Sequence, residues 1–245
     1  MSGNTIDSDL NRVVPGSGEL DTIWHPGTPR VGKCGVILLH GQSNPQGWID
    51  PGAPRYAMEM AATITACGIP CISAEMHGNA WANDVMMPDI PAAKTVLRNA
   101  YPSLRADKVI VFGISMGGAP AVRYAQQNPT AVAAVIGLIP AYDPLAVYNY
   151  GNIGDFYMEQ AWGFSGVANF PAALNLAATS SLAAGIPILT GYSSNDDAVP
   201  AASVIAYHNA VGGTSENLIN IGAVGHTFDT MPISTVVRFL VANGA

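Results

Sequence analysis

The sequence predicts an α/β protein with three layers, in which helices cover both faces of a mostly parallel central sheet. Two observations predict this fold class. Short apolar runs alternate along most of the chain with Ala-rich stretches that end near Gly or Pro, which is typical of strand–helix–strand units. The apolar runs are also continuous, as expected of strands that are buried on both faces. The 245 residues suffice for one large domain of this class.

Seven apolar runs are predicted to be strands. The clearest, "KCGVILLH" at 33–40, is apolar almost throughout. "ELDTIWHP" at 19–26 precedes the regular pattern, so we expect an outer strand there. The runs, two of them with their exit loops, lie at 19–26, 33–40, 69–78, 107–115, 131–140, 186–194 and 216–226.

Five stretches between the strands are predicted to be helices. "PRYAMEMAATITACG" at 54–68 is rich in Ala and Met and ends in Gly, whereas "IPAAKTVLRNAYP" at 90–102 ends in Pro. The helices lie at 54–68, 90–102, 116–128, 199–213 and 231–244.

One stretch, 141–185, is too long for a simple connection between two strands. It holds eight of the 19 aromatic residues of the chain, and we expect a cap-like insertion or long loop over the strand ends. These side chains either line a binding site or only pack the insertion onto the domain. Residues 1–20 are polar and turn-rich, which predicts an N-terminal arm, and 21–245 are predicted to form a single α/β domain. The aromatic residues are Tyr142, Tyr148, Tyr150, Phe156, Tyr157, Trp162, Phe164 and Phe170.

Charge and hydropathy limit the partners. The net charge is -7 and no basic stretch occurs, so we expect neither nucleic acid nor anionic lipid as a partner. No apolar run reaches about 18 residues, so no membrane span is expected. The N-terminus lacks a basic start followed by an apolar core, so no signal peptide is predicted and the cytoplasm is the default location. Export by another route, a removed leader or mounting on a particle stays open.

The three cysteines are too few for a disulfide framework. We expect Cys34, Cys67 and Cys71 to be small buried residues, with a bridge between Cys67 and Cys71 as the alternative. No metal site is expected.

Gly113, Ser115 and Gly117 form the pattern G-x-S-x-G between a predicted strand and a predicted helix. In that context the pattern predicts a serine on a sharp turn, exposed at the top of the sheet as a nucleophile. A side chain at position 113 or 117 would collide with the neighbouring strand or helix, so glycine is needed there. The N-terminal amides of the helix at 116–128 point toward the serine oxygen.

A serine hydroxyl needs a base that takes up its proton. The base has to reach the serine across the carboxyl edge of the sheet, so a loop after a late strand suits it best. His226 follows the last predicted strand in "GAVGHTFDT" and meets this condition. We expect His40 to pack or hydrogen-bond at the end of its strand, and His208 to be a solvated helix residue.

The imidazole in turn needs a carboxylate that fixes its tautomer and stabilises the imidazolium. "ILTGYSSNDDAVP" supplies Asp196 and Asp197 directly after a predicted strand. We prefer Asp196 and keep Asp197 as a competitor, with Asp143 as a weaker rival. The chain order Ser, Asp, His is the order that sheets with this serine turn use.

The developing charge on a substrate oxygen needs fixed hydrogen-bond donors. One candidate is the backbone N–H of Met116, directly after the serine. The second is the backbone N–H of Gln42 in "HGQSN" at 40–44, where Gly41 lets the backbone approach the serine closely.

The segments "LLHGQ", "GISMGG", "NDDAVP" and "GHTF" occur in this order, and together they resemble the α/β-hydrolase family from about residue 33 to the C-terminus. The resemblance implies a mostly parallel eight-stranded sheet, a Ser-His-acid triad and no cofactor. The first strands of the family are poorly visible in residues 1–30, so a sheet with fewer strands is also compatible. The residues that match the family's site are Ser115 as nucleophile, His226 as base, Asp196 as acid, and Gln42 and Met116 as oxyanion-hole positions.

We therefore expect a carboxylic ester hydrolase that works through an acyl-enzyme. The aromatic insertion, with Trp48 and Trp81 near strand-end loops, favours an apolar acyl or alkyl group on a small-molecule or cell-envelope ester. A serine peptidase or amidase and an acyltransferase are alternatives that use the same triad. A non-catalytic binding or structural module on a larger assembly is the alternative of a different class. The natural substrate and the oligomeric state are not predicted.

Overall fold

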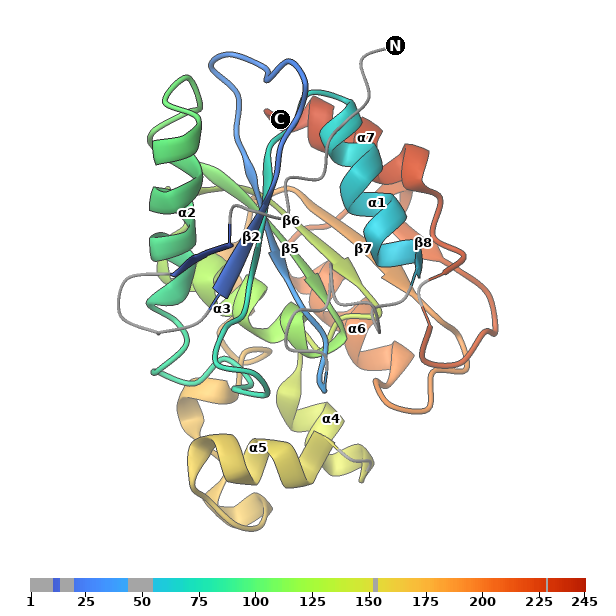
Figure 1. The fold of residues 1–245 in the computed structure, drawn as a ribbon. Helices are drawn as coiled ribbons and strands as arrows, with labels where there is room; N and C mark the ends of the chain where they lie inside the picture. The colour runs from blue at the N-terminus through green and yellow to red at the C-terminus, as the bar shows by residue number, and fades with distance from the viewer. Residues whose placement is uncertain (1–10, 14–19, 44–54, 152–153, 228) are drawn as a thin grey trace.

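A computed structural model describes residues 11–13, 20–43, 55–151, 154–227 and 229–245. Within these residues the strands form one eight-stranded sheet in the order β1-β2-β4-β3-β5-β6-β7-β8, with helices on both faces (Figure 1). The predicted three-layer α/β class is therefore confirmed. The strands are β1 (Asn11–Val13), β2 (Leu20–Trp24), β3 (Val36–Leu39), β4 (Cys71–Ala74), β5 (Val109–Ile114), β6 (Val132–Leu138), β7 (Ile188–Tyr192) and β8 (Leu218–Asn220).

The sheet is parallel from β4 through β8 and antiparallel at the other edge. β1 pairs antiparallel with β2, and β2 pairs antiparallel with β4. All other neighbouring strands are parallel, and Leu39 at the end of β3 pairs with Ala74 of β4 and Gly113 of β5. Because parallel strands run in the same direction, the loops that follow them emerge at one edge, the carboxyl edge of the sheet.

Two sets of helices cover the two faces. Val36 and Leu38 of β3 belong to the same apolar cluster as residues of α1 and α7, whereas Ile37 and Leu39 cluster with residues of α2, α3 and α6. All four side chains are at most 1% exposed, so β3 is buried on both faces, as its continuous apolar run predicts. The helices are α1 (Arg55–Ala66), α2 (Asp89–Ala100), α3 (Gly118–Gln127), α6 (Ala201–Ala210) and α7 (Ile233–Ala242).

Three predicted elements differ in detail from the structure. β1 lies inside the stretch 1–20 and pairs with β2, so β2, which was predicted to be an outer strand, has a neighbour on each side. The assignment of the stretch 1–20 as an arm stays a prediction. β8 is only three residues long, because a 3-10 turn at Ser215–Asn217 takes up the start of the predicted run. The helix predicted at 116–128 is preceded by a 3-10 turn, Ser115–Gly117 (η1), and its α-helical part begins at Gly118.

An insertion of short helices connects β6 to β7. Figure 1 shows its two α-helices at one end of the molecule, beyond the sheet. The rings of Tyr148, Phe164 and Phe170 lie 5.5–5.6 Å apart between centroids, so these three pack the insertion against itself. Phe156, in contrast, is 62% exposed. The elements are α4 (Pro144–Tyr150), α5 (Gly154–Trp162) and the 3-10 turns Val167–Asn169, Ala172–Leu174 and Ser180–Ala183.

All three cysteines are free, so the alternative bridge between Cys67 and Cys71 is not formed. Cys34 and Cys71 are buried, as expected, and Cys67 is half-buried. Burial raises the pKa of the Cys71 thiol to about 12, so this side chain stays a protonated, unreactive core residue.

Candidate active site

Ser115 stands on a sharp turn between β5 and α3. β5 ends at Ile114, and η1 leads directly into α3. The backbone of Ser115 has a φ of +49°, in the left-handed region that residues with a side chain rarely adopt. Strain of this kind persists only where the surrounding structure holds it, and it gathers at functional sites.

The glycines on either side of Ser115 are required by close backbone contacts. A Cβ atom on Gly113 would lie 2.2 Å from the carbonyl oxygen of Gly117. A Cβ atom on Gly117 would lie 2.3 Å from the carbonyl oxygen of Leu39 in β3. Neither clash can be relieved by turning a side chain, because both involve backbone atoms. The predicted need for glycine at both positions is therefore confirmed.

His226 lies in the loop between β8 and α7 and reaches the serine hydroxyl. Its Nε2 is 2.8 Å from Oγ of Ser115, and its Nδ1 is 2.9 Å from each carboxylate oxygen of Asp196. An ionised carboxylate only accepts hydrogen bonds, so Nδ1 carries the proton and Nε2 is left as the acceptor for the hydroxyl. The imidazole is thus oriented to receive the proton of Ser115.

Asp196 follows β7 and is held by the backbone of its own loop. Its Oδ1 accepts the N–H groups of Ala198 at 2.9 Å and Val199 at 2.7 Å. The side chain is only 2% exposed, whereas that of His226 is 25% exposed. The carboxylate is therefore buried and fixed, while the imidazole remains accessible from solvent.

The competing carboxylates lie elsewhere. Asp197 is exposed, and Oδ1 of Asp143 accepts the N–H of Ala146 as the N-cap of α4. Of the neighbouring pair at 196 and 197, the carboxylate that contacts the imidazole is that of Asp196.

The structure also locates His40 and His208, for which the sequence predicts no catalytic role. His40 is buried at the end of β3, where its Nε2 lies 2.6 Å from the carbonyl oxygen of Glu75, so its predicted hydrogen bonding is confirmed. The prediction of a solvated His208 is wrong. This side chain is fully buried, with Nδ1 2.9 Å from Oγ1 of Thr190 and Nε2 3.0 Å from the carbonyl oxygen of Thr214. The reason is that α6 packs this position onto the sheet, where two hydrogen bonds satisfy both ring nitrogens.

The loop at 40–43 lies beside the serine turn. A Cβ atom on Gly41 would lie 3.5 Å from Cβ of Ser115, an ordinary contact that shows how closely the two backbones approach. In the described part of the chain, the backbone N–H of Gln42 donates to no acceptor. Met116, the second predicted oxyanion-hole residue, directly follows the serine and is buried. The structure thus brings the loop that contains Gln42 close to Ser115, and Met116 follows the serine in the chain.

Sequence reasoning missed the side chains that hold this loop. Nε1 of Trp81 donates to Oε1 of Gln42 at 3.0 Å, and Nε1 of Trp162 on α5 donates to the carbonyl oxygen of Trp81 at 2.9 Å. The sequence singled out Trp81 only as an apolar residue near a strand end. These bonds join residues 39 and 81 positions apart, and no local pattern signals such a pairing. Trp48, which was predicted together with Trp81 to favour an apolar substrate group, lies outside the described residues.

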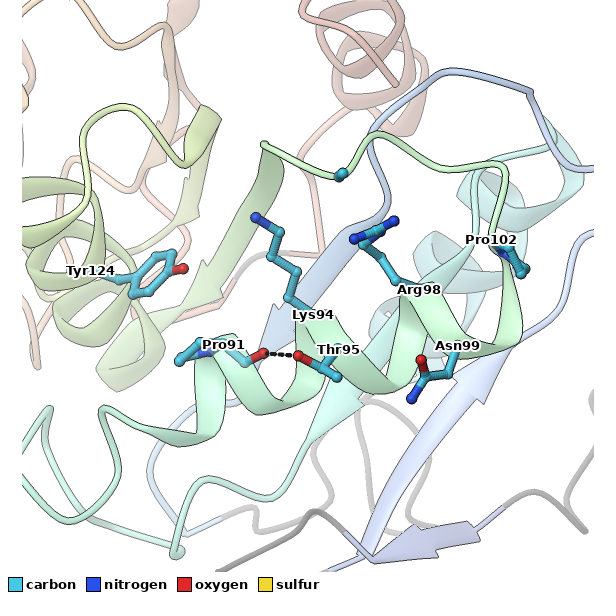
Figure 2. A pocket seen from close by; sticks show the side chains of 8 residues that line it. Pro91, Lys94, Thr95, Arg98, Asn99, Pro102 and Tyr124 are labelled. Carbon is cyan, nitrogen blue, oxygen red and sulfur yellow. Dashed lines mark hydrogen bonds between the residues drawn. The ribbon is translucent and has the colours of Figure 1, made fainter.

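A groove of about 520 Å³ lies along α2, apart from this site. Figure 2 shows Lys94 and Arg98 on α2 and Tyr124 on α3 around it. The groove also contacts Pro102 and Ala106 in the segment before β5. That segment lies at the amino edge of the sheet, whereas Ser115 follows β5 at the carboxyl edge.

Among the described residues, no group of three or more His, Cys, Asp or Glu side chains is placed to hold a metal ion. In the same ranges, no helix has the length and apolar character needed to cross a membrane.

Several solved structures match the chain over most of its length. MPT51 (FbpC1) of Mycobacterium tuberculosis matches with a TM-score of 0.70 and 15% identity, over 96% of this chain and 98% of its own. Est1E of Butyrivibrio proteoclasticus matches with a TM-score of 0.65 and 16% identity, over 91% of this chain and 93% of its own. The acylaminoacyl peptidase of Pyrococcus horikoshii matches with a TM-score of 0.65 and 15% identity, over 90% of this chain. No family model and no curated protein sequence matches.

These structures have the α/β-hydrolase fold, and the chain described here has the same fold. The resemblance of the four sequence segments is thereby confirmed at the level of the fold. The chain spans only 37% of the length of the acylaminoacyl peptidase, so it corresponds to one part of that protein.

Proposed function

We propose that the protein is a serine hydrolase that cleaves carboxylic esters through an acyl-enzyme. One observation carries the proposal: Ser115, His226 and Asp196 form a continuous chain of hydrogen bonds, with contacts of 2.8 and 2.9 Å. The carboxylate faces Nδ1 and the hydroxyl faces Nε2, which is the arrangement of a Ser-His-Asp triad. The likeness of fold to Est1E and to a peptidase supports a hydrolase.

In the first half-reaction, Oγ of Ser115 forms a bond to the acyl carbon while Nε2 of His226 takes the hydroxyl proton. The tetrahedral intermediate then collapses as the bond to the leaving alcohol breaks, and His226 returns the proton to the alcohol oxygen. In the second half-reaction, water attacks the acyl carbon while His226 takes one of its protons. The bond between the acyl carbon and Oγ of Ser115 then breaks, and His226 returns the proton to Oγ, which releases the acid and the free serine. Asp196 stabilises the imidazolium in both halves.

The oxyanion of each tetrahedral intermediate needs donors that are already in place. We assign this role to the backbone N–H groups of Gln42 and Met116. The Gln42 N–H donates to no acceptor among the described residues, and Gly41 approaches Ser115 closely; both observations support the assignment.

The insertion supports an apolar acyl or alkyl group in the substrate. The hydroxyl of Tyr150, in the last turn of α4, lies 3.4 Å from the carbonyl oxygen of Asp196, so the insertion reaches the loop that carries the proposed acid. The packed rings of Tyr148, Phe164 and Phe170 belong to the same insertion. The exposed rings of Tyr150 and Phe156 add apolar surface on the insertion, which supports an apolar group in the substrate.

Labelling with a fluorophosphonate probe tests the class of enzyme. We expect a single adduct on Ser115 by peptide mass spectrometry, and none in the Ser115→Ala variant. The His226→Ala variant is expected to lose labelling as well, because the hydroxyl is then not activated. Ser181→Ala, which changes an exposed serine of the insertion, is the matched control and keeps full labelling. A folded protein whose Ser115 stays unlabelled contradicts the proposal.

Ester and amide substrates test the bond that is cleaved. We expect turnover of p-nitrophenyl esters with kcat/KM rising from acetate to longer acyl chains, and far slower cleavage of the matching p-nitroanilides. Faster cleavage of the anilides would assign a peptidase or amidase, and transfer to an added alcohol in preference to water would assign an acyltransferase. A preference for charged acyl groups contradicts the apolar site.

A further inference from the structure

We propose that Trp81 is a positioning residue that holds the 40–43 loop in place and connects it to the insertion. The inference rests on the proposed function, because the backbone N–H of Gln42 in this loop is the proposed oxyanion donor. Trp81 lies in the 75–83 loop, which follows β4 and contacts both the 40–43 loop and α5.

Three of the four residues in the 40–43 loop contact the 75–83 loop. The central contact is the bond from Nε1 of Trp81 to Oε1 of Gln42 at 3.0 Å. It fixes the side chain of the residue whose backbone N–H has to point at the substrate oxygen. Two contacts flank it: the N–H of Ser43 donates to Oδ1 of Asn79 at 2.6 Å, and Nε2 of His40 lies 2.6 Å from the carbonyl oxygen of Glu75.

Trp81 is held in a conformation that it would not adopt by itself. Its φ is +46° and that of Ala82 is +57°, so two consecutive residues with side chains occupy the left-handed region. For a bulky residue this conformation is a true outlier, which persists only where several contacts oppose its relaxation. Trp81 is only 3% exposed, and its carbonyl oxygen accepts the indole N–H of Trp162 at 2.9 Å.

The insertion supplies much of this restraint. On α5, the carbonyl oxygen of Ala161 accepts Nδ2 of Asn83 at 3.0 Å, next to the bond made by Trp162. Arg123 of α3 contacts the same residues: its guanidinium donates to the carbonyl oxygen of Ala82 and lies 5.3 Å from the ring centroid of Trp162. Trp162, Trp81 and Gln42 therefore form a continuous path of contacts from the insertion to the proposed oxyanion donor.

This path affects the transition state more than the bound substrate. The carbonyl oxygen of an ester carries little charge in the ground state and a full charge in the tetrahedral intermediate. A donor that points a few tenths of an ångström away from its ideal place therefore costs rate, while substrate affinity changes little. Loss of the indole N–H of Trp81 should thus lower kcat and leave KM almost unchanged.

The first test is Trp81→Phe, which removes the indole N–H and keeps an aromatic ring. We expect kcat to fall about 10-fold, less than the roughly 100- to 1,000-fold loss caused by removing an oxyanion donor outright, with KM within twofold of wild type. The affinity for a trifluoromethyl ketone, whose adduct with Ser115 carries the oxyanion, should fall by the same factor as kcat/KM. The affinity for the carboxylic acid product should stay unchanged.

Trp24→Phe is the matched control. Trp24 on β2 is as buried as Trp81, at 2% exposed, but its Nε1 has no hydrogen-bond partner in the described ranges. The same change of side chain there removes packing without removing a hydrogen bond, so kcat and ketone affinity should match wild type.

Gln42→Met removes the same hydrogen bond from the other side and leaves Trp81 in place, which covers the case in which Trp81→Phe does not fold. If the bond acts as proposed, the double variant should be no slower than the slower single variant, because both changes remove one interaction. Multiplied losses in the double variant, a raised KM with unchanged kcat, or an equal loss in Trp24→Phe would overturn the positioning role. Each of these outcomes is compatible with fluorophosphonate labelling of Ser115 and contradicts only the role of Trp81. Absent labelling of Ser115 contradicts the proposed function itself.

Discussion

The two sides of the candidate site are held in place by different means. On one side, the serine turn is fixed by backbone atoms close together in the chain and in the next strand, since Gly113 faces Gly117 and Gly117 faces β3. On the other side, the 40–43 loop is fixed by side chains that come from distant parts of the chain, above all by Trp81. The serine turn is thus built by local steric constraints, whereas the loop depends on the tertiary structure around it. Substitutions in the serine turn should therefore cause large losses of stability or activity, whereas substitutions around the 40–43 loop should cause smaller losses.

The largest effect is expected for Asp196→Asn, which changes the carboxylate that contacts the imidazole of His226. An amide in this place can present its NH2 group to the imidazole, which favours the wrong tautomer and leaves the imidazolium without a counter-charge. We expect kcat for an ester to fall about 10,000-fold, equivalent to about 5.5 kcal/mol of transition-state free energy, with an unchanged circular dichroism spectrum. Asp197→Asn is the neighbouring control and should stay within threefold of wild type. Equal losses in the two variants would contradict the assignment of Asp196.

Gly117→Ala tests the steric part of the comparison. The added Cβ would lie 2.3 Å from the carbonyl oxygen of Leu39, so β3 or the serine turn has to shift. We expect the free energy of unfolding in urea to fall by about 3 kcal/mol or more, or no folded protein at all. Gly212→Ala is the control: its φ is +84° but no atom lies within 4 Å, so the loss should be about 1 kcal/mol. Similar losses at the two positions would mean that the contact with β3 can relax.

The buried His208 allows acid effects on folding to be separated from acid effects on the site. Burial lowers the pKa of its imidazole below the ordinary value of 6.5, so the unfolded chain binds this proton more readily than the folded one. Its contribution to stability is therefore complete above the unfolded pKa and is lost as the pH falls below about 6.5. We expect the unfolding free energy to drop more between pH 7.5 and 5.5 in wild type than in His208→Asn. Urea titrations at the two pH values measure this difference, and equal drops would assign the acid sensitivity to other groups.

The smallest effect is expected at the far end of the path to the insertion, in Trp162→Phe. This change removes the hydrogen bond to the carbonyl oxygen of Trp81 but leaves the bond from Trp81 to Gln42 intact. One such bond contributes about 1 kcal/mol, of which only a part reaches the loop, so we expect kcat to fall about threefold. The loss should stay below that of Trp81→Phe measured with the same ester. A larger loss would mean that the insertion acts on the substrate directly.

The order of strands and helices could be predicted from the sequence because apolar periodicity and Gly or Pro at helix ends are local signals. Each predicted helix of the two outer layers corresponds to an observed one, with ends shifted by a few residues. The weakest assignment was β8, where a 3-10 turn replaced the start of the run. His208 was misassigned because a histidine in a helix gives no sign of which face the helix buries.

What the sequence by itself determined is the succession of strands and helices from β2 to the C-terminus, the serine turn and the positions of His226 and Asp196 after late strands. These follow from residues near one another in the chain, through backbone sterics and the burial of continuous apolar runs. Only the tertiary structure decided that Asp196 rather than Asp197 meets the imidazole, and that Trp81 and Trp162 hold Gln42. Neighbouring carboxylates look alike in a sequence, and a contact across 39 or 81 positions exists only once the chain has folded.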